Sequence, residues 1–102
     1  MSYSRIDVAE ARALIEQGAL VVDIRDAASY AAGCIEGAVH LHGGNIEQFL
    51  QECDFTRALI VCCYHGNASQ GAAAYLADKG FAQACSLDGG YEAWEEASAS
   101  SS

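Results

Sequence analysis

The stretch that decides the fold is ALIVCCYHGNAS, residues 58–69. Its first part, residues 58–62, is a continuous apolar run of the kind that predicts a strand buried on both faces of a sheet. Residues 69–79 then carry apolar side chains at helical spacing, and Gly80 follows as the expected C-terminal cap. A buried strand, a short loop and a helix in this order indicate a parallel sheet with helical crossovers.

The rest of the chain repeats this alternation of strands and helices. Asp7 and Glu10 have the spacing of a capping box, which predicts a helix that continues to Gly18. Asn45 is the expected N-cap of a later helix, with Gln48 at its third position. Strands are further expected at 20–24, 39–41 and 82–87, and helices at 26–32, 46–52 and 91–97. The pattern predicts an α/β fold, with a mainly parallel sheet covered on both faces and a site beyond the strand carboxyl ends.

Length and charge limit the class of protein. The 102 residues show no break in composition, so we expect one domain over 1–97 and a flexible Ser/Ala tail at 98–102. The net charge is −9 and the five basic residues are scattered, which argues against nucleic acid or an anionic membrane as partners. The N-terminus has no signal-peptide run, and nowhere do 18 apolar residues follow one another, so we expect a soluble, cytoplasmic protein.

Five cysteines stand at positions 34, 53, 62, 63 and 85. Their odd number, without CxxC spacing or paired histidines, predicts neither a disulfide framework nor a metal site, and no cofactor is indicated. Cys63 ends the predicted strand and precedes a helix, whose N-terminus and backbone N–H groups favour a thiolate and lower the pKa of the thiol. Cys62 alternates to the opposite side of the strand and is expected in the core, while the other three are interpreted as packing residues.

The loop after Cys63 has the composition of an anion cradle. Gly66 allows a tight turn, and the small residues Ala68 and Ser69 allow N–H groups to approach an anion closely. The loop contains no Lys or Arg, so backbone amides would hold the anion, with His65 and Asn67 as further candidates, and a persulfide suits it better than phosphate. Cys63 is therefore the candidate catalytic residue, and the candidate substrate-binding residues are Tyr64, His65, Gly66, Asn67, Ala68 and Ser69.

Three separated motifs resemble those of the single-domain rhodaneses: VVDIRDAASYAAGCIEGAVHL (21–41), CYHGNAS (63–69) and LDGGYEAW (87–94). The resemblance implies a five-stranded parallel sheet flanked by helices, and makes Cys63 the nucleophile that opens a six-residue loop ending at Ala68. It further implies a thiosulfate sulfurtransferase: thiosulfate gives its outer sulfur to Cys63, and the persulfide passes it to cyanide or a thiol. Thioredoxin, glutathione and cyanide all remain open as acceptors.

Two positions depart from the family. Many rhodaneses have Arg where this chain has Ala68, although one subgroup also has a small residue there. The family often has His at the position of Cys34. Asp23 and Arg25, in the first motif, are interpreted as an ion pair that braces neighbouring loops, and Tyr91 and Trp94 as residues that pack the last helix on the sheet.

Two other functions compete with this one. A cysteine phosphatase or arsenate reductase needs the pattern CxxxxxR, and position 69 is Ser, so the guanidinium that pairs with phosphate or arsenate is missing. A persulfide carrier or partner-binding rhodanese module that does not turn over thiosulfate stays open, because nothing in the loop identifies the acceptor.

Overall fold

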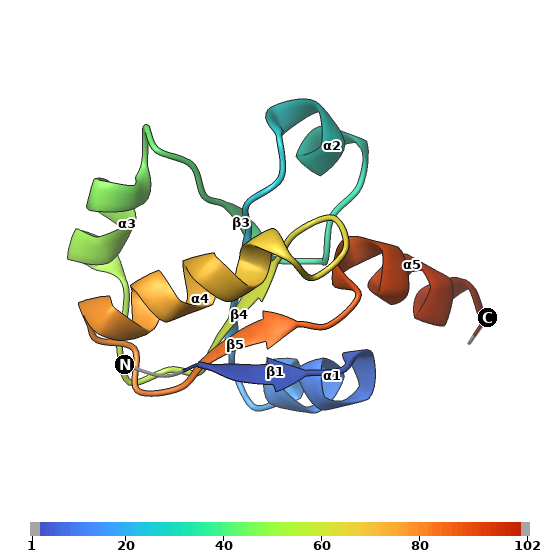
Figure 1. The fold of residues 1–102 in the computed structure, drawn as a ribbon, viewed down its shortest axis with the longest axis horizontal. Helices are drawn as coiled ribbons and strands as arrows, with labels where there is room; N and C mark the ends of the chain where they lie inside the picture. The colour runs from blue at the N-terminus through green and yellow to red at the C-terminus, as the bar shows by residue number, and fades with distance from the viewer. Residues whose placement is uncertain (1–2, 101–102) are drawn as a thin grey trace.

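Five parallel strands form the central sheet of the computed structural model, which describes residues 3–100 (Figure 1). The strands are β1 (Ser4–Ile6), β2 (Leu20–Asp23), β3 (Val39–His40), β4 (Leu59–Cys62) and β5 (Ala84–Leu87), in the spatial order β1-β5-β4-β2-β3. Every side chain of β4 and β5 is buried, as a strand inside a parallel sheet requires. The predicted α/β class and parallel sheet are confirmed, and β1, which carries a single buried residue, is an addition.

Helices cover both faces of this sheet. They are α1 (Val8–Glu16), α2 (Ala27–Ala32), α3 (Ile46–Glu52), α4 (Ala68–Lys79) and α5 (Gly90–Ser100). Tyr91 and Trp94 of α5 pack with α1 against one core cluster, which confirms their predicted role. Phe49 of α3 and Leu76 of α4 belong to the cluster on the opposite face. In residues 3–100 no helix is long and apolar enough to cross a bilayer.

Two of these helices begin at the N-cap residues that the sequence predicts. The Asp7 carboxylate accepts from Glu10 N at 2.8 Å and the Glu10 carboxylate accepts from Asp7 N at 3.1 Å, so the predicted capping box is present. Asn45 occupies the N-cap position of α3, as predicted, but its side chain makes no capping hydrogen bond. The Asn45 amide instead donates to His40 O at 2.7 Å and accepts from His42 N at 2.8 Å, because the turn after β3 supplies these partners.

The last helix is longer than its sequence pattern predicts. It continues through residues 98–100, which we expected in a flexible tail, whereas residues 101–102 of that tail lie outside the described residues. Residues 98–100 form the last turn of α5, since Ala is a strong helix former.

Candidate active site

Cys63 lies directly after β4, at the carboxyl edge of the sheet, and is 2% exposed. Its Sγ accepts hydrogen bonds from Gly66 N at 3.1 Å and from Ser69 N at 3.3 Å. The Ser69 hydroxyl lies 3.2 Å from the same sulfur. Because α4 begins at Ala68, Ser69 N is one of the free N–H groups of the first helical turn.

These contacts change the acidity of Cys63. Burial alone disfavours the thiolate, but hydrogen bonds from the Ser69 hydroxyl and from the N–H groups of Ser69, Gly66 and His65 outweigh it and lower the pKa of the Cys63 thiol. The site therefore favours a thiolate in a nearly water-free position.

The N-terminus of α5 orients the loop that supplies these donors. Tyr91 N donates to Cys63 O at 2.8 Å, and Glu92 N donates to Tyr64 O at 3.3 Å. The C=O and N–H groups of one trans peptide unit point in opposite directions. Fixing the Tyr64 carbonyl on α5 therefore turns the His65 N–H the other way, toward the sulfur. Sequence reasoning missed this contribution, because it comes from backbone groups of a distant helix.

Two glycines allow the loop and the turn before α5 to touch through their backbones. Gly66 has φ +90°, and a Cβ there would lie 2.7 Å from Gly89 N. Gly90 has φ +59°, and its Cβ would lie 2.5 Å from Cys63 O. A side chain at either position would separate the two segments, so the tight turn predicted at Gly66 is confirmed and Gly90 joins it as a requirement of the site.

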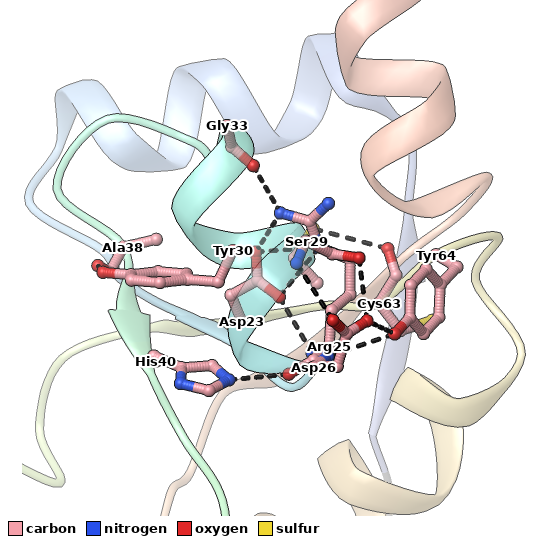
Figure 2. A network of polar contacts seen from close by, with 11 residues as sticks. Asp23, Arg25, Asp26, Ser29, Tyr30, Gly33, Ala38, His40, Cys63 and Tyr64 are labelled. Atoms are coloured by element: carbon pink, nitrogen blue, oxygen red, sulfur yellow. Dashed lines mark hydrogen bonds and ion pairs between the residues drawn. The ribbon is translucent and has the colours of Figure 1, made fainter.

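A side chain fixes the other side of the loop to α2. The Tyr64 hydroxyl donates to Asp26 Oδ1 and accepts from Asp26 N at 3.1 Å (Figure 2). Asp26 also caps α2 by accepting from Ser29 N at 3.0 Å. The hydrogen bonds from Tyr64 and then from Ser29 lower the pKa of the Asp26 carboxyl well below its ordinary range. Asp26 was not singled out from the sequence, although an Asp before a helical segment is the signal of such a cap.

The buried Arg25 side chain forms a brace, a set of contacts with Asp23, Gly33 and Tyr91, behind the active-site loop (Figure 2). Its Nη2 lies 2.7 Å from Asp23 Oδ2 and donates to Gly33 O at 2.6 Å, and its guanidinium lies 4.2 Å from the centre of the Tyr91 ring. The hydrogen bond to Asp23 is the main reason that the pKa of Arg25 is raised. The predicted ion pair is confirmed, and it joins the end of β2 to α2 and α5.

The remaining predicted loop residues lie around the rim of the site. His65, Asn67 and Ala68 are exposed, and His65 Nδ1 is 3.6 Å from Glu92 Oε1. Asn67 occupies the N-cap position of α4 without a side-chain capping bond. Within residues 3–100, Ser69 contributes the one side chain that hydrogen-bonds the sulfur; the other contacts are backbone N–H groups.

The other cysteines lie in ordinary packing environments. Cys62 is fully buried in the cluster under α1 and α5, and burial, followed by the charge of Asp23, raises the pKa of its thiol to about 12. Cys85 is buried, and Cys34 and Cys53 are half-buried. Among the residues the structure describes, no three or more His, Cys, Asp or Glu side chains form a group that could hold a metal ion.

The chain belongs to the rhodanese-like family, since the family model described as "Rhodanese-like domain" matches residues 7–97. Among curated proteins it is 54% identical over 92 residues to the thiosulfate sulfurtransferase GlpE of Pseudomonas fluorescens (strain SBW25), with 90% of this chain and 84% of the relative covered. The resemblance that the three motifs indicated is confirmed.

Solved structures share the fold. The BH2092 protein of Bacillus halodurans superposes with a TM-score of 0.79 at 31% identity, over 95% of this chain and 74% of that chain. The human single-domain sulfurtransferase TSTD1 superposes with a TM-score of 0.76 at 22% identity, over 93% of this chain and 97% of that chain.

Proposed function

We propose that the protein is a thiosulfate sulfurtransferase in which Cys63 carries the transferred sulfur as a persulfide. The observation that carries the proposal is the Cys63 sulfur itself, which is buried and yet surrounded by hydrogen-bond donors that favour its thiolate. The name of the Pseudomonas relative, at 54% identity, supports thiosulfate as the donor.

The reaction has two half-steps. In the first, the Cys63 thiolate attacks the outer sulfur of thiosulfate, the S–S bond of thiosulfate breaks, and sulfite leaves with the electron pair of that bond. Cys63 then carries one extra sulfur as a persulfide anion. In the second, the nucleophilic atom of cyanide or of a thiolate bonds to this outer sulfur, and Cys63 leaves as a thiolate. The N–H groups of Gly66 and Ser69 stabilise the negative charge that returns to Sγ.

The geometry favours sulfur transfer over phosphoryl transfer. Cys63 is 2% exposed, and attack on thiosulfate requires only its terminal sulfur to reach the nucleophile, whereas attack on a phosphate requires the central phosphorus to reach it. Residue 69 is a buried serine that contacts the nucleophile, so no arginine fork stands where a phosphatase of the CxxxxxR type would need one. For the acceptor we propose cyanide or a thiol, which includes thioredoxin, in a reducing compartment such as the cytoplasm, where Cys63 stays a thiol.

Intact mass after incubation with thiosulfate tests the proposal. The wild-type protein and Cys62→Ser should each become one sulfur atom heavier, whereas Cys63→Ser should not. Adding cyanide should then remove the extra mass and release thiocyanate. An adduct that persists in Cys63→Ser contradicts the assignment of Cys63, and an adduct that cyanide and thiols cannot discharge contradicts the transferase.

A further inference from the structure

A second buried serine lies behind the one that contacts Cys63. Ser86, on β5, has its Oγ 2.7 Å from Ser69 Oγ, and Ser69 Oγ lies 3.2 Å from Cys63 Sγ. Both serines are 0% exposed. Across residues 3–100, the Ser86 hydroxyl has no hydrogen-bond partner other than Ser69 Oγ. The three side chains therefore form a line that starts in the sheet and ends at the sulfur.

Packing does not explain a hydroxyl at position 86. Side chains two residues apart on a strand share a face, so Ser86 points to the same side of β5 as Ala84. Ala84 is buried in the apolar cluster under α3 and α4 without any polar atom on its side chain. A buried hydroxyl is costly unless it is hydrogen-bonded, so a role for its hydrogen bond is the better account.

The number of protons available to this line of three side chains, Ser86, Ser69 and Cys63, fits a thiolate at Cys63. Two hydrogen bonds join the three atoms, and each needs one proton. When Cys63 is a thiolate, the Ser86 hydroxyl donates to Ser69 Oγ and the Ser69 hydroxyl donates to Sγ, so both protons are used. When Cys63 is a thiol, the line holds three protons for two hydrogen bonds, and one proton has no acceptor within it.

We propose that Ser86 is a positioning residue for sulfur transfer, whose hydroxyl donates to Ser69 Oγ and thereby holds the Ser69 hydroxyl in the orientation that donates to the Cys63 sulfur. The inference rests on the proposed function of Cys63 as the nucleophile. Donation from Ser86 also polarises the Ser69 hydroxyl, because hydrogen bonds in a chain strengthen one another. The line thus acts when Cys63 attacks and again when it leaves as a thiolate.

The test is the pH dependence of Cys63 alkylation by iodoacetamide, followed by mass spectrometry of the peptide that contains Cys63. Ser86→Ala should move the midpoint of this profile up by about 0.5 pH unit, and Ser69→Ala should move it further. Adding Ser86→Ala to Ser69→Ala should give no additional shift. Cys85→Ala is the matched control, because it removes one buried heavy atom from the neighbouring position of β5 and should leave the midpoint unchanged.

Three results would overturn the inference: an unchanged midpoint in Ser86→Ala, an equal shift in Cys85→Ala, or a full further shift when both serines are replaced. Should Ser86→Ala not fold, as judged by circular dichroism, Ser86→Cys serves in its place, since a thiol is a weak donor and should give the same upward shift. Alkylation requires no turnover, so this result is independent of the thiosulfate adduct that tests the proposed function.

Discussion

Cys62 and Cys63 are neighbours in the chain, and both are almost completely buried, with exposed fractions of 0% and 2%. Their thiols nevertheless shift in opposite directions. Burial and then the charge of Asp23 raise the pKa of Cys62 to about 12. For Cys63 the cost of burial is outweighed by the Ser69 hydroxyl and three backbone N–H groups, which lower the pKa of its thiol. Burial alone therefore does not decide the state of a cysteine here; the donors directed at its sulfur do.

Arg25→Met alters the surroundings of Cys62, because Arg25 pairs with Asp23, whose charge raises the pKa of Cys62. This substitution should have the largest effect on stability. It leaves the carboxylate of Asp23, which is fully buried, without its ion-pair partner. Removing one partner of a buried pair costs about 3–5 kcal/mol, and urea denaturation should show a loss of this size in the free energy of unfolding. Arg5→Met, which removes an exposed pair with Asp88, is the control and should change little. Equal losses in both variants would show that the brace contributes no more than a surface pair.

Brief labelling with iodoacetamide at pH 7 compares the two thiols directly. We expect Cys63 to react more than about a hundredfold faster than Cys62, because the thiolate is the reacting form and the pKa of Cys62 is raised to about 12. In concentrated urea the two should react at similar rates, since the fold creates the difference. Comparable rates in the native protein would contradict the opposite pKa shifts.

Gly90→Ala should weaken the hydrogen-bond donors that distinguish the Cys63 thiol from the Cys62 thiol. The new Cβ would meet Cys63 O at 2.5 Å, so the loop must move away from α5 and its N–H groups away from the sulfur. We expect the rate of sulfur uptake from thiosulfate to fall by about tenfold or more, because small displacements at a nucleophile are costly. Gly71→Ala, on α4, is the matched control, because a Cβ there would meet nothing within 4 Å. This variant should keep the wild-type rate of sulfur uptake and gain about 0.5–1 kcal/mol of stability.

Cys62 and Cys63 should also contribute in opposite directions to the pH dependence of the free energy of unfolding, and this is the smallest of the expected effects. The lowered pKa of Cys63 means that the unfolded chain binds more protons there, so its contribution is full above the unfolded value of about 8.5 and is lost as the pH falls through the folded pKa. The raised pKa of Cys62 acts in the opposite sense and removes stability above about pH 8.5.

Urea denaturation between pH 7 and pH 10 measures both contributions. Cys62→Ala should flatten the decline in the free energy of unfolding at high pH, by up to about 1.4 kcal/mol per pH unit. Cys63→Ala should remove the rise in the free energy of unfolding that precedes this decline as the pH increases. Identical pH profiles for the two variants would mean that the folded protein does not distinguish the thiols.

Features set by neighbouring residues could be predicted from the sequence. The capping box at Asp7 and Glu10 lies within one turn, and Cys63, Gly66 and Ser69 lie within seven consecutive residues, so their spacing was enough. Asn45 shows the limit of such reasoning: its residue type suits a cap, but the turn after β3 offers its amide other partners.

Features that depend on distant segments could not be predicted in this way. The N–H groups of Tyr91 and Glu92 reach the loop only after α5 packs on the sheet, and a backbone group has no signature in the sequence. Ser86 did leave a signal, since it is an isolated hydroxyl in the buried strand Ala84–Leu87, but its partner could not be known before the strands were placed side by side.

The contacts between α5 and the active-site loop also set an order of events during synthesis. A ribosome completes all five cysteines before it adds Gly90 and the first turn of α5. Until that turn docks, the carbonyl groups of Cys63 and Tyr64 lack these partners, and the His65 N–H is not held toward the sulfur. In a growing chain the environment of the Cys63 thiol is therefore completed only when α5 has folded onto the domain.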